Sequence, residues 1–417
     1  MHHESAVDRR VAKEGPVRVL GACLSTCLLA LAAPRACDGQ AADPAVTQIT
    51  MLEQSYAASR QPALKFLLAE AYARVGERRR ALEALRVIVD SGRGYLPPSH
   101  SPLWKYAGDA EFSALLVQLR AGVPVTSNGS VKYVLRGASI VPEGLAYDER
   151  TGRLYIGDMH GRQVYAIGKG GEIAPAVKNL ALQPLGLFVD AARRRLWIAS
   201  NNSNTNAVTR RSELVRVDLE TGERRAFSEP RATALNDVTV APNGDVYTSD
   251  FGSGAIFKLT AEAQQLTALL EPGALAFPNG LAVDHSGRRL FVAQGLAIVS
   301  IELASGRMQR LTAPEDLDTI GTDGLYYRGG VLYGVQNLVT PGRVVRMRLA
   351  DDGSRISGYD VLESAHAQFD VPTTAAFVAN TLLVLANAQI HRLDASGKVD
   401  APGLKPIVLL GYDIGPE

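Results

Sequence analysis

Four side chains with carboxylate or amide oxygens stand at equivalent places in a plan that the sequence repeats. They are Glu143, Asn236, Asn279 and Asp323, each at the head of a short, mainly apolar stretch. Oxygen ligands with two formal negative charges and no thiolate or imidazole favour Ca2+, or another divalent metal of similar preference, over zinc or copper. Any one of them alone is more often a turn or strand cap. Facing one another without a cation they would repel or stay unsatisfied, so together they indicate a metal site.

The elements that must position these residues follow from the repeat. Between 143 and 386, six stretches each read as a small apolar strand, a turn and a second strand with a large apolar residue, which predicts four-stranded blades of a β-propeller. We expect six blades over 130–417, with the strand from Lys132 to Arg136 completing the last blade beside C-terminal strands. By subtraction, the large residues lie 42, 50, 44, 42 and 50 positions apart: Tyr155, Trp197, Tyr247, Phe291, Tyr333 and Leu383.

The residue at the head of each blade should face the propeller axis, because the innermost strand of every blade runs along the central channel. Residues at this shared position then form a ring at one end of the channel. The predicted ring, blade by blade, is Glu143, Leu185, Asn236, Asn279, Asp323 and Thr373.

A helical segment precedes the predicted propeller. Over 43–122 the sequence is rich in Ala, Leu, Glu and Arg, with apolar residues at spacings of three and four, which is typical of helices. An ordinary helical hairpin and one tetratricopeptide-like repeat are both open interpretations, and a single repeat should dock on the rest of the chain to bury its face. The positions that match the repeat are Leu68, Ala69, Tyr72, Gly76, Ala81 and Leu85.

The first 42 residues resemble a targeting segment, with a basic lead before the apolar run 19–33 and small residues after it. The run is too short for a membrane span, so we expect a periplasmic or secreted protein. Cys23, Cys27 and Cys37 all lie in or beside this segment, which leaves a lipid anchor as a weakly signalled alternative. The net charge of +1 does not indicate a basic surface for nucleic acid, so we expect a small-molecule substrate as the partner.

The motifs around the ring positions resemble one family: PEGLAYD at Glu143, LND at Asn236, PNGLAVD at Asn279 and TDGL at Asp323. Over roughly 131–393 the sequence is similar to the senescence marker protein (regucalcin), gluconolactonase and luciferin-regenerating enzyme family of six-bladed propellers. The resemblance implies a divalent metal, usually calcium, on Glu143, Asn279 and Asp323, with Asn236 binding metal or substrate. It also implies lactone hydrolysis. Sugar-lactone hydrolases of this family carry an arginine where this chain has Ala234, which argues against gluconolactone.

Further candidates lie near the predicted mouth of the channel. The long polar loop 200–214 could form a lid or be a tolerated insertion, and we expect Asn201 and Thr373, with Asn236, to contact substrate. His160 and His366 could move protons, although solvated loop positions are the simpler interpretation.

Two functional hypotheses follow from these residues. In the first, the protein is a calcium-dependent lactonase or esterase in which Asp323 or Glu143 orients or deprotonates water. In the second, calcium only stiffens a non-catalytic propeller that binds a ligand, or a protein partner through the helical hairpin.

Overall fold

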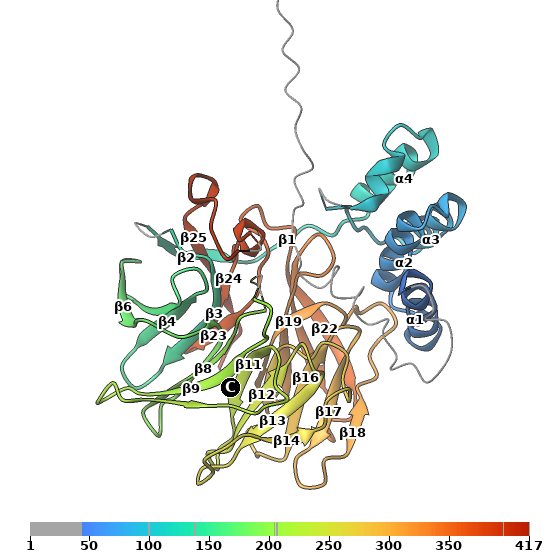
Figure 1. The fold of residues 1–417 in the computed structure, drawn as a ribbon. Coiled ribbons are helices and arrows are strands. Elements are labelled where there is room, and N and C mark those ends of the chain that lie inside the picture. Colours follow the sequence, from blue (N-terminus) through green and yellow to red (C-terminus); the bar gives the residue numbers. More distant parts are fainter. Residues whose placement is uncertain are drawn as a thin grey trace, which may run out of the picture.

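The computed structural model describes residues 44–98, 101–136, 139–203, 205, 207–394 and 396–416. The predicted targeting segment 1–42 lies outside the described residues. The fold is mainly β, with six sheets that form the blades of a propeller and a group of helices before them (Figure 1). The predicted six-bladed propeller is confirmed.

Each of the first three blades is a simple antiparallel meander in which sequential strands are neighbours. Blade 1 contains β3 (Pro142–Asp148), β4 (Arg153–Asp158), β5 (Gln163–Ile167) and β6 (Ile173–Val177). Blade 2 contains β7 (Gln183–Asp190), β8 (Arg195–Asn201), β9 (Ser212–Asp218) and β10 (Arg224–Phe227). Blade 3 contains β11 (Leu235–Val240), β12 (Val246–Asp250), β13 (Ala255–Leu259) and β14 (Thr267–Leu270).

The last three blades follow the same plan, and blades 5 and 6 each include one strand that precedes blade 1 in the sequence. Blade 4 contains β15 (Leu281–Val283), β16 (Arg289–Gln294), β17 (Ala297–Glu302) and β18 (Met308–Arg310). Blade 5 contains β19 (Thr322–Arg328), β20 (Val331–Gln336), β21 (Arg343–Leu349), β22 (Ile356–Ser364) and the short β1 (Thr126–Ser127). Blade 6 contains β23 (Ala375–Val378), β24 (Thr381–Leu385), β25 (Ile407–Asp413) and β2 (Ser130–Leu135).

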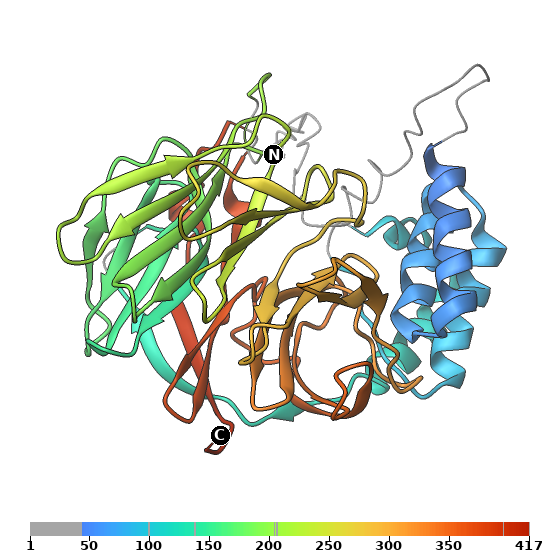
Figure 2. The ribbon, with the colours of Figure 1, turned by 90° about the horizontal axis from the view of Figure 1, so that it is seen from below.

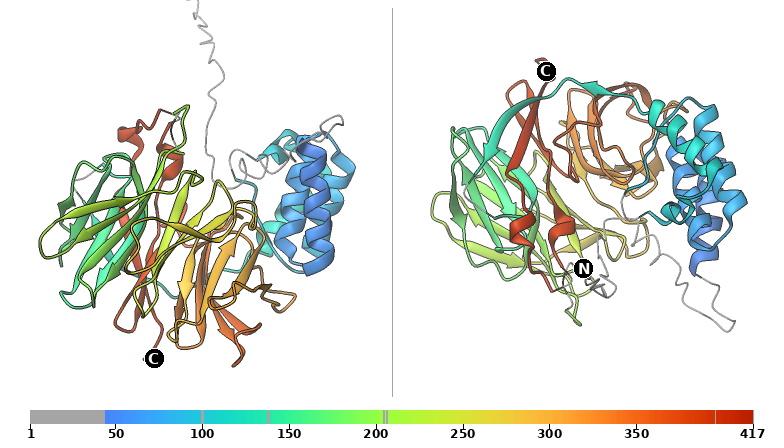
Figure 3. Two further views of the ribbon diagram at one scale, coloured as in Figure 1. Left: turned by 60° about the horizontal axis from the view of Figure 1, so that its bottom comes forward. Right: turned by 90° about the horizontal axis from the view of Figure 1, so that it is seen from above.

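Blade 6 closes the ring as predicted, because its outermost strand comes from the start of the propeller. β2 pairs antiparallel with β25, and Val131 lies opposite Leu410. The red strands of blade 6 therefore lie between the green strands of blade 1 and the orange strands of blade 5 (Figure 3). The sequence did not predict that β1 extends blade 5, where Thr126 lies opposite Ser364.

The large second-strand residues explain why the repeats pack as blades. Each is buried against apolar side chains of the following blade, as Tyr155 is with Leu187 of blade 2 and Trp197 with Phe257 of blade 3. Leu383 of blade 6 packs with residues of blade 1, which completes the circle. Burial of such side chains is worth about 1.5–3 kcal/mol each, so this repeated position stabilises every junction.

The helices pack together at the side of the propeller next to blades 4 and 5 (Figure 2). Pro62 stands at the first turn of its helix, where a missing N–H costs nothing, and Gly76 makes the following turn with a φ of +87°. None of the described helices is long and apolar enough to cross a membrane. The helical elements are α1 (Pro44–Ser59), α2 (Pro62–Arg74), α3 (Arg78–Asp90), η2 (Pro102–Tyr106) and α4 (Ala110–Ala121).

Candidate functional site

The heads of the innermost strands interlock through backbone hydrogen bonds at one end of the propeller. The N–H of Gly280 in blade 4 donates to the carbonyl of Asp323 in blade 5 at 2.9 Å. The N–H of Gly324 donates to the carbonyl of Thr373 in blade 6, also at 2.9 Å. The Thr373 hydroxyl in turn donates to the carbonyl of Glu143 in blade 1 at 3.2 Å. Four of the six predicted ring positions, Asn279, Asp323, Thr373 and Glu143, are therefore linked, either directly or through the glycine that follows the ring residue.

Glycine after the ring residue permits this close approach. A Cβ added at Gly280 would lie 2.4 Å from the carbonyl oxygen of Asp323, and one at Gly144 would lie 2.0 Å from that of Leu185. These distances are far below van der Waals contact, so only a residue without a side chain fits at either place. The glycines of PEGLAYD and PNGLAVD thus bring the ring side chains together.

The Asp323 carboxylate accepts hydrogen bonds on both of its oxygens. The Nδ2 of Asn279 donates to its Oδ1 at 2.5 Å, and the Nδ2 of Asn337 donates to its Oδ2. Asn337 follows β20 in the same blade, and the sequence analysis did not single it out. Its Nδ2 also donates to the carbonyl of Pro372, while its Oδ1 is buried without a hydrogen-bond partner. Such an orphaned oxygen beside a carboxylate is suited to a water molecule or a cation.

Asp237 is a second residue that the sequence analysis left without a role. It stands next to Asn236 at the position where four other repeats have glycine, which is the signal that could have identified it. Its Oδ1 accepts from the N–H of Val238 at 2.8 Å and its Oδ2 from the N–H of Leu281 at 3.0 Å. The carboxylate therefore joins blade 3 to blade 4.

The buried carboxyl groups of Glu143, Asp237 and Asp323 lie close enough to affect one another's charge. Burial, followed by the charges of Asp323 and Asp237, raises the pKa of Glu143 well above its ordinary value. Burial raises the pKa of Asp323 to about 7, although hydrogen bonds from Asn337 and Asn279 counteract the rise. Burial likewise raises the pKa of Asp237 to about 7. A divalent cation would relieve this repulsion, so the residues present fit a metal.

The asparagines are a necessary part of any such site. Within the described residues, no three His, Cys, Asp or Glu side chains gather closely enough to hold a metal by themselves. Glu143 and Asp323 supply the carboxylates, and Asn279 touches Asp323 directly. Asn236 lies beside Asp237 at the head of β11 and is partly accessible.

The predicted substrate residues have structural contacts as well. The Nδ2 of Asn201 donates to the carbonyl of Leu235, and its Oδ1 accepts from the N–H and hydroxyl of Ser203. Asn201 thus connects the loop after β8 to blade 3, and it is buried. The hydroxyl of Thr373 donates to the backbone carbonyl of Glu143, as described above.

The loop after β8 meets the loop 386–406, which joins β24 to β25, at the ring end of the propeller. The methyl carbon of Thr205 lies 3.6 Å from the place where a Cβ on Gly397 would stand. The carbonyl of that same glycine lies 3.1 Å from Nδ1 of the exposed His160. The partly exposed His366 accepts from the N–H of Gln368. These contacts are local to the loops.

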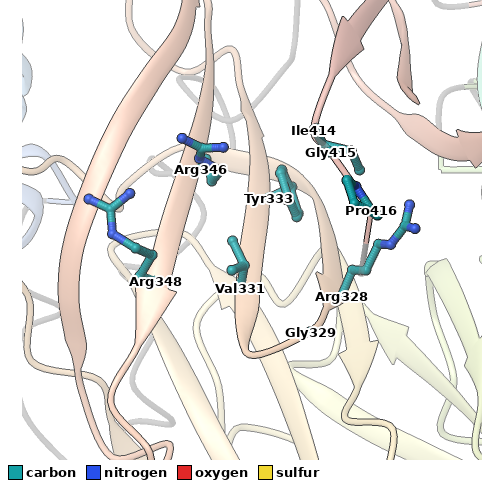
Figure 4. A pocket seen from close by; sticks show the side chains of 9 residues that line it. All are labelled: Arg328, Gly329, Val331, Tyr333, Arg346, Arg348, Ile414, Gly415 and Pro416. Carbon is teal, nitrogen blue, oxygen red and sulfur yellow. The ribbon is translucent and has the colours of Figure 1, made fainter. Parts of the chain in front are cut away.

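A separate groove of about 320 Å³ lies at the opposite end, between blades 5 and 6 (Figure 4). Arg346 and Arg348 lie on one side of Tyr333 and Arg328 on the other. Both Arg346 and Arg348 donate to Asp360 Oδ2, so their charge is already engaged within blade 5. The three guanidinium groups do not converge on one point, and the groove is not part of the ring site.

These observations define a class of protein, a six-bladed β-propeller with carboxylate and amide side chains gathered at one end. The chain carries an SMP-30/Gluconolactonase/LRE-like region, because the model of that family matches residues 141–319. The matched stretch contains Glu143, Asn236 and Asn279, while Asp323 follows four residues after it. The resemblance seen in the motifs is thereby confirmed. No curated protein matches the sequence at significant similarity.

Solved structures similar to this chain have low sequence identity to it. A gluconolactonase from Xanthomonas campestris is 17% identical, with 69% of this chain and 91% of that chain covered and a TM-score of 0.48. A virginiamycin B lyase from Staphylococcus aureus is 16% identical, with 60% and 79% covered and a TM-score of 0.46. An aldose sugar dehydrogenase from Streptomyces coelicolor is 16% identical, with 70% and 99% covered and a TM-score of 0.45.

Proposed function

We propose that the protein is a calcium-dependent hydrolase of a lactone or a related ester, exported to the periplasm or the medium. The observation that carries the proposal is the buried group of Glu143, Asn279 and Asp323, in which the charge of Asp323 helps to raise the pKa of Glu143. The family region supports a lactonase-type propeller.

The ligands for the metal would be Glu143, Asn236, Asn279 and Asp323, all through oxygen. When bound there, Ca2+ would polarise the carbonyl of the ester and stabilise the negative charge that develops on its oxygen. Asn279 and Asn337 hold the Asp323 carboxylate from both of its oxygens, which fixes its orientation before substrate arrives.

Water attack on the ester requires a group that accepts a proton. Glu143 and Asp323 are the candidates, because both are carboxyls at the ring and both have raised pKa values. A raised pKa makes a carboxylate a stronger base, and a bound Ca2+ would offset part of that rise. Either residue can orient the attacking water and take its proton on a carboxylate oxygen.

The substrate class follows from what surrounds the ring. Ala234 is buried two residues before Asn236, and its N–H donates to Asp250 Oδ1 at 2.8 Å. An alanine offers no hydrogen bond to a sugar hydroxyl, so we propose lactones or esters with few hydroxyl groups.

A panel of lactones, esters and organophosphates, assayed after chelation and again after calcium is restored, tests this function. Activity that disappears with the chelator and returns with calcium supports the proposal. A folded, calcium-loaded protein that hydrolyses no member above the buffer rate, but binds a protein through its helices, would instead be a calcium-stiffened recognition propeller. Export is tested by the mass of the protein from its native host, where an intact 1–42 in the cytosol contradicts it.

A further inference from the structure

The helices contact the propeller through buried polar groups at one loop, residues 311–321 between β18 and β19. Oε1 of Gln61 accepts from the N–H of Thr319 at 2.7 Å and from that of Ile320 at 3.2 Å. In the other direction, the N–H of Ala63 donates to Oδ1 of Asp318 at 3.0 Å. All five residues are buried, so each bond lacks competition from water.

This exchange resembles a helix cap divided between two parts of the chain. Gln61 is the N-cap residue of α2, yet its side chain makes no bond to its own helix. The first turn of a helix has unpaired N–H groups and a partial positive charge, both of which favour a carboxylate. Asp318 of the propeller supplies that carboxylate, while Gln61 pairs the N–H groups of the propeller loop.

A second pair of contacts holds the other oxygen of Asp318. The hydroxyl of Tyr95 and Nη1 of Arg343 both donate to its Oδ2, the latter at 3.2 Å. The Arg343 guanidinium lies over the Tyr95 ring, 5.0 Å from the centroid. Burial and the charge of Asp318 raise the pKa of Tyr95, so its hydroxyl keeps the proton that it donates.

Loop 311–321 leads directly into β19, whose second residue is Asp323. The hydroxyl of Thr322 donates to the carbonyl of Thr319 at 2.9 Å, and Nε2 of Gln336 donates to that of Asp318 at 2.7 Å. The N–H of Asn337, whose side chain holds the Asp323 carboxylate, donates to the carbonyl of Gly321 at 3.1 Å. The two N–H groups that Gln61 binds thus belong to residues three and four positions before Asp323.

Apolar packing reinforces this path. Ile320 belongs to the hydrophobic core of the helices and not to a core between blades. Gly321 has a φ of +67°, and an added Cβ would lie 2.2 Å from Cβ of Leu338. The loop therefore has little room to shift between the helices and the ring.

We infer that the helical segment is part of the framework of the ring site, with Gln61 and Asp318 as positioning residues for Asp323. The inference deepens the proposed function and rests on it, since its consequence is a change in metal affinity. Outer contacts that orient a metal ligand typically change affinity about 10- to 100-fold when they are lost.

The test compares two variants of the full chain. Gln61→Met keeps the length of the side chain but removes the oxygen that Thr319 and Ile320 contact. Ser101→Ala is the matched control, because it removes a buried 2.6 Å hydrogen bond to Glu70 within the helical segment and leaves the propeller loop untouched. Calcium affinity is measured by titration calorimetry, and amide hydrogen exchange is followed over 317–324.

Gln61→Met should weaken calcium binding at least about tenfold and speed exchange over 317–324, while Ser101→Ala should change neither. If Gln61→Met does not fold, Tyr95→Phe removes one donor to Asp318 and should show the same two effects more weakly. Wild-type affinity in a folded Gln61→Met or Tyr95→Phe protein would overturn the inference. If the wild type binds no calcium, the proposed function fails, and equal exchange in wild type and Gln61→Met then overturns the positioning role separately.

Discussion

Asn279 and Asp323, which stand at the heads of neighbouring blades, are joined by a hydrogen bond of 2.5 Å from amide nitrogen to carboxylate oxygen. Because the nitrogen of this amide faces Asp323, the oxygen of the same amide is the atom that can serve a cation. One side chain can thus orient a carboxylate and offer a ligand of its own.

Calcium should stabilise the protein, because the ring supplies oxygen ligands that bind it only in the folded state. At a hundredfold excess over the dissociation constant the gain is about 2.7 kcal/mol, visible as a rise in melting temperature. Asp323→Ala should abolish most of this rise, while Glu149→Ala on an exposed turn should retain it. An unchanged melting curve of thoroughly chelated wild type after calcium addition would contradict a calcium site.

Loss of a ring residue should impair turnover far more than folding. Asn279→Ala and Asp323→Asn should each lower kcat on an active lactone or ester by about 100- to 1,000-fold, the usual cost of one preorganised electrostatic contact. Circular dichroism and thermal melting would establish that both variants are folded. Turnover within a few-fold of wild type in either variant would exclude that residue from the reaction.

Ala234 should make the enzyme selective against sugars. Polyhydroxylated sugar lactones should show lower kcat/KM than apolar lactones of the same ring size, because no arginine is present to bind their hydroxyls. The comparison needs only steady-state rates on matched pairs of lactones. A preference for gluconolactone would contradict this reading of Ala234.

The chelated protein should lose stability as the pH rises from about 4 to about 7. The pKa of Asp323 is raised by burial from 3.8 to about 7, so the folded state binds a proton in this interval that the unfolded state has released. Stability from this group is complete below pH 3.8 and is lost as the pH passes 7. The groups that face it are Asn279, Asn337, Asp237 and Glu143.

Urea unfolding of chelated protein at several pH values measures this slope. Asp323→Asn cannot titrate at the ring position, so it should lose part of the decline, whereas Glu149→Ala should keep all of it. Equal slopes for wild type and Asp323→Asn would show that Asp323 keeps its ordinary pKa.

The repeat was sufficient to predict the propeller, because one large residue per blade, such as Tyr155, recurs and packs against the next blade. The same alignment predicted that Glu143, Asn279 and Asp323 share one end. The glycine that follows each of these residues gave a physical reason for the prediction, because a strand can approach the next blade so closely only at a residue without a side chain.

Asn337 reaches Asp323 from the end of a second strand, four residues after Tyr333. Asn201 and Asn387 stand at the same distance after Trp197 and Leu383, so the repeat contained a pattern that could have identified Asn337. The contact of the helices with the propeller had no such pattern. Gln61 and Thr319 are 258 positions apart, and nothing in either neighbourhood indicates the other. Asp237 was a detectable omission as well, because a carboxylate stands where four repeats have glycine.

The pairing of Val131 with Leu410 sets an order of events during synthesis. β2 leaves the ribosome before any other strand of the six blades except β1, yet its partner β25 is made last. Until residues 407–413 emerge, β2 and β24 both expose unpaired backbone edges, which are templates for wrong pairing. The edges of β2 and β24 must therefore stay unpaired while the first five blades form. Closure of the ring by β25 is then a late, long-range step in folding.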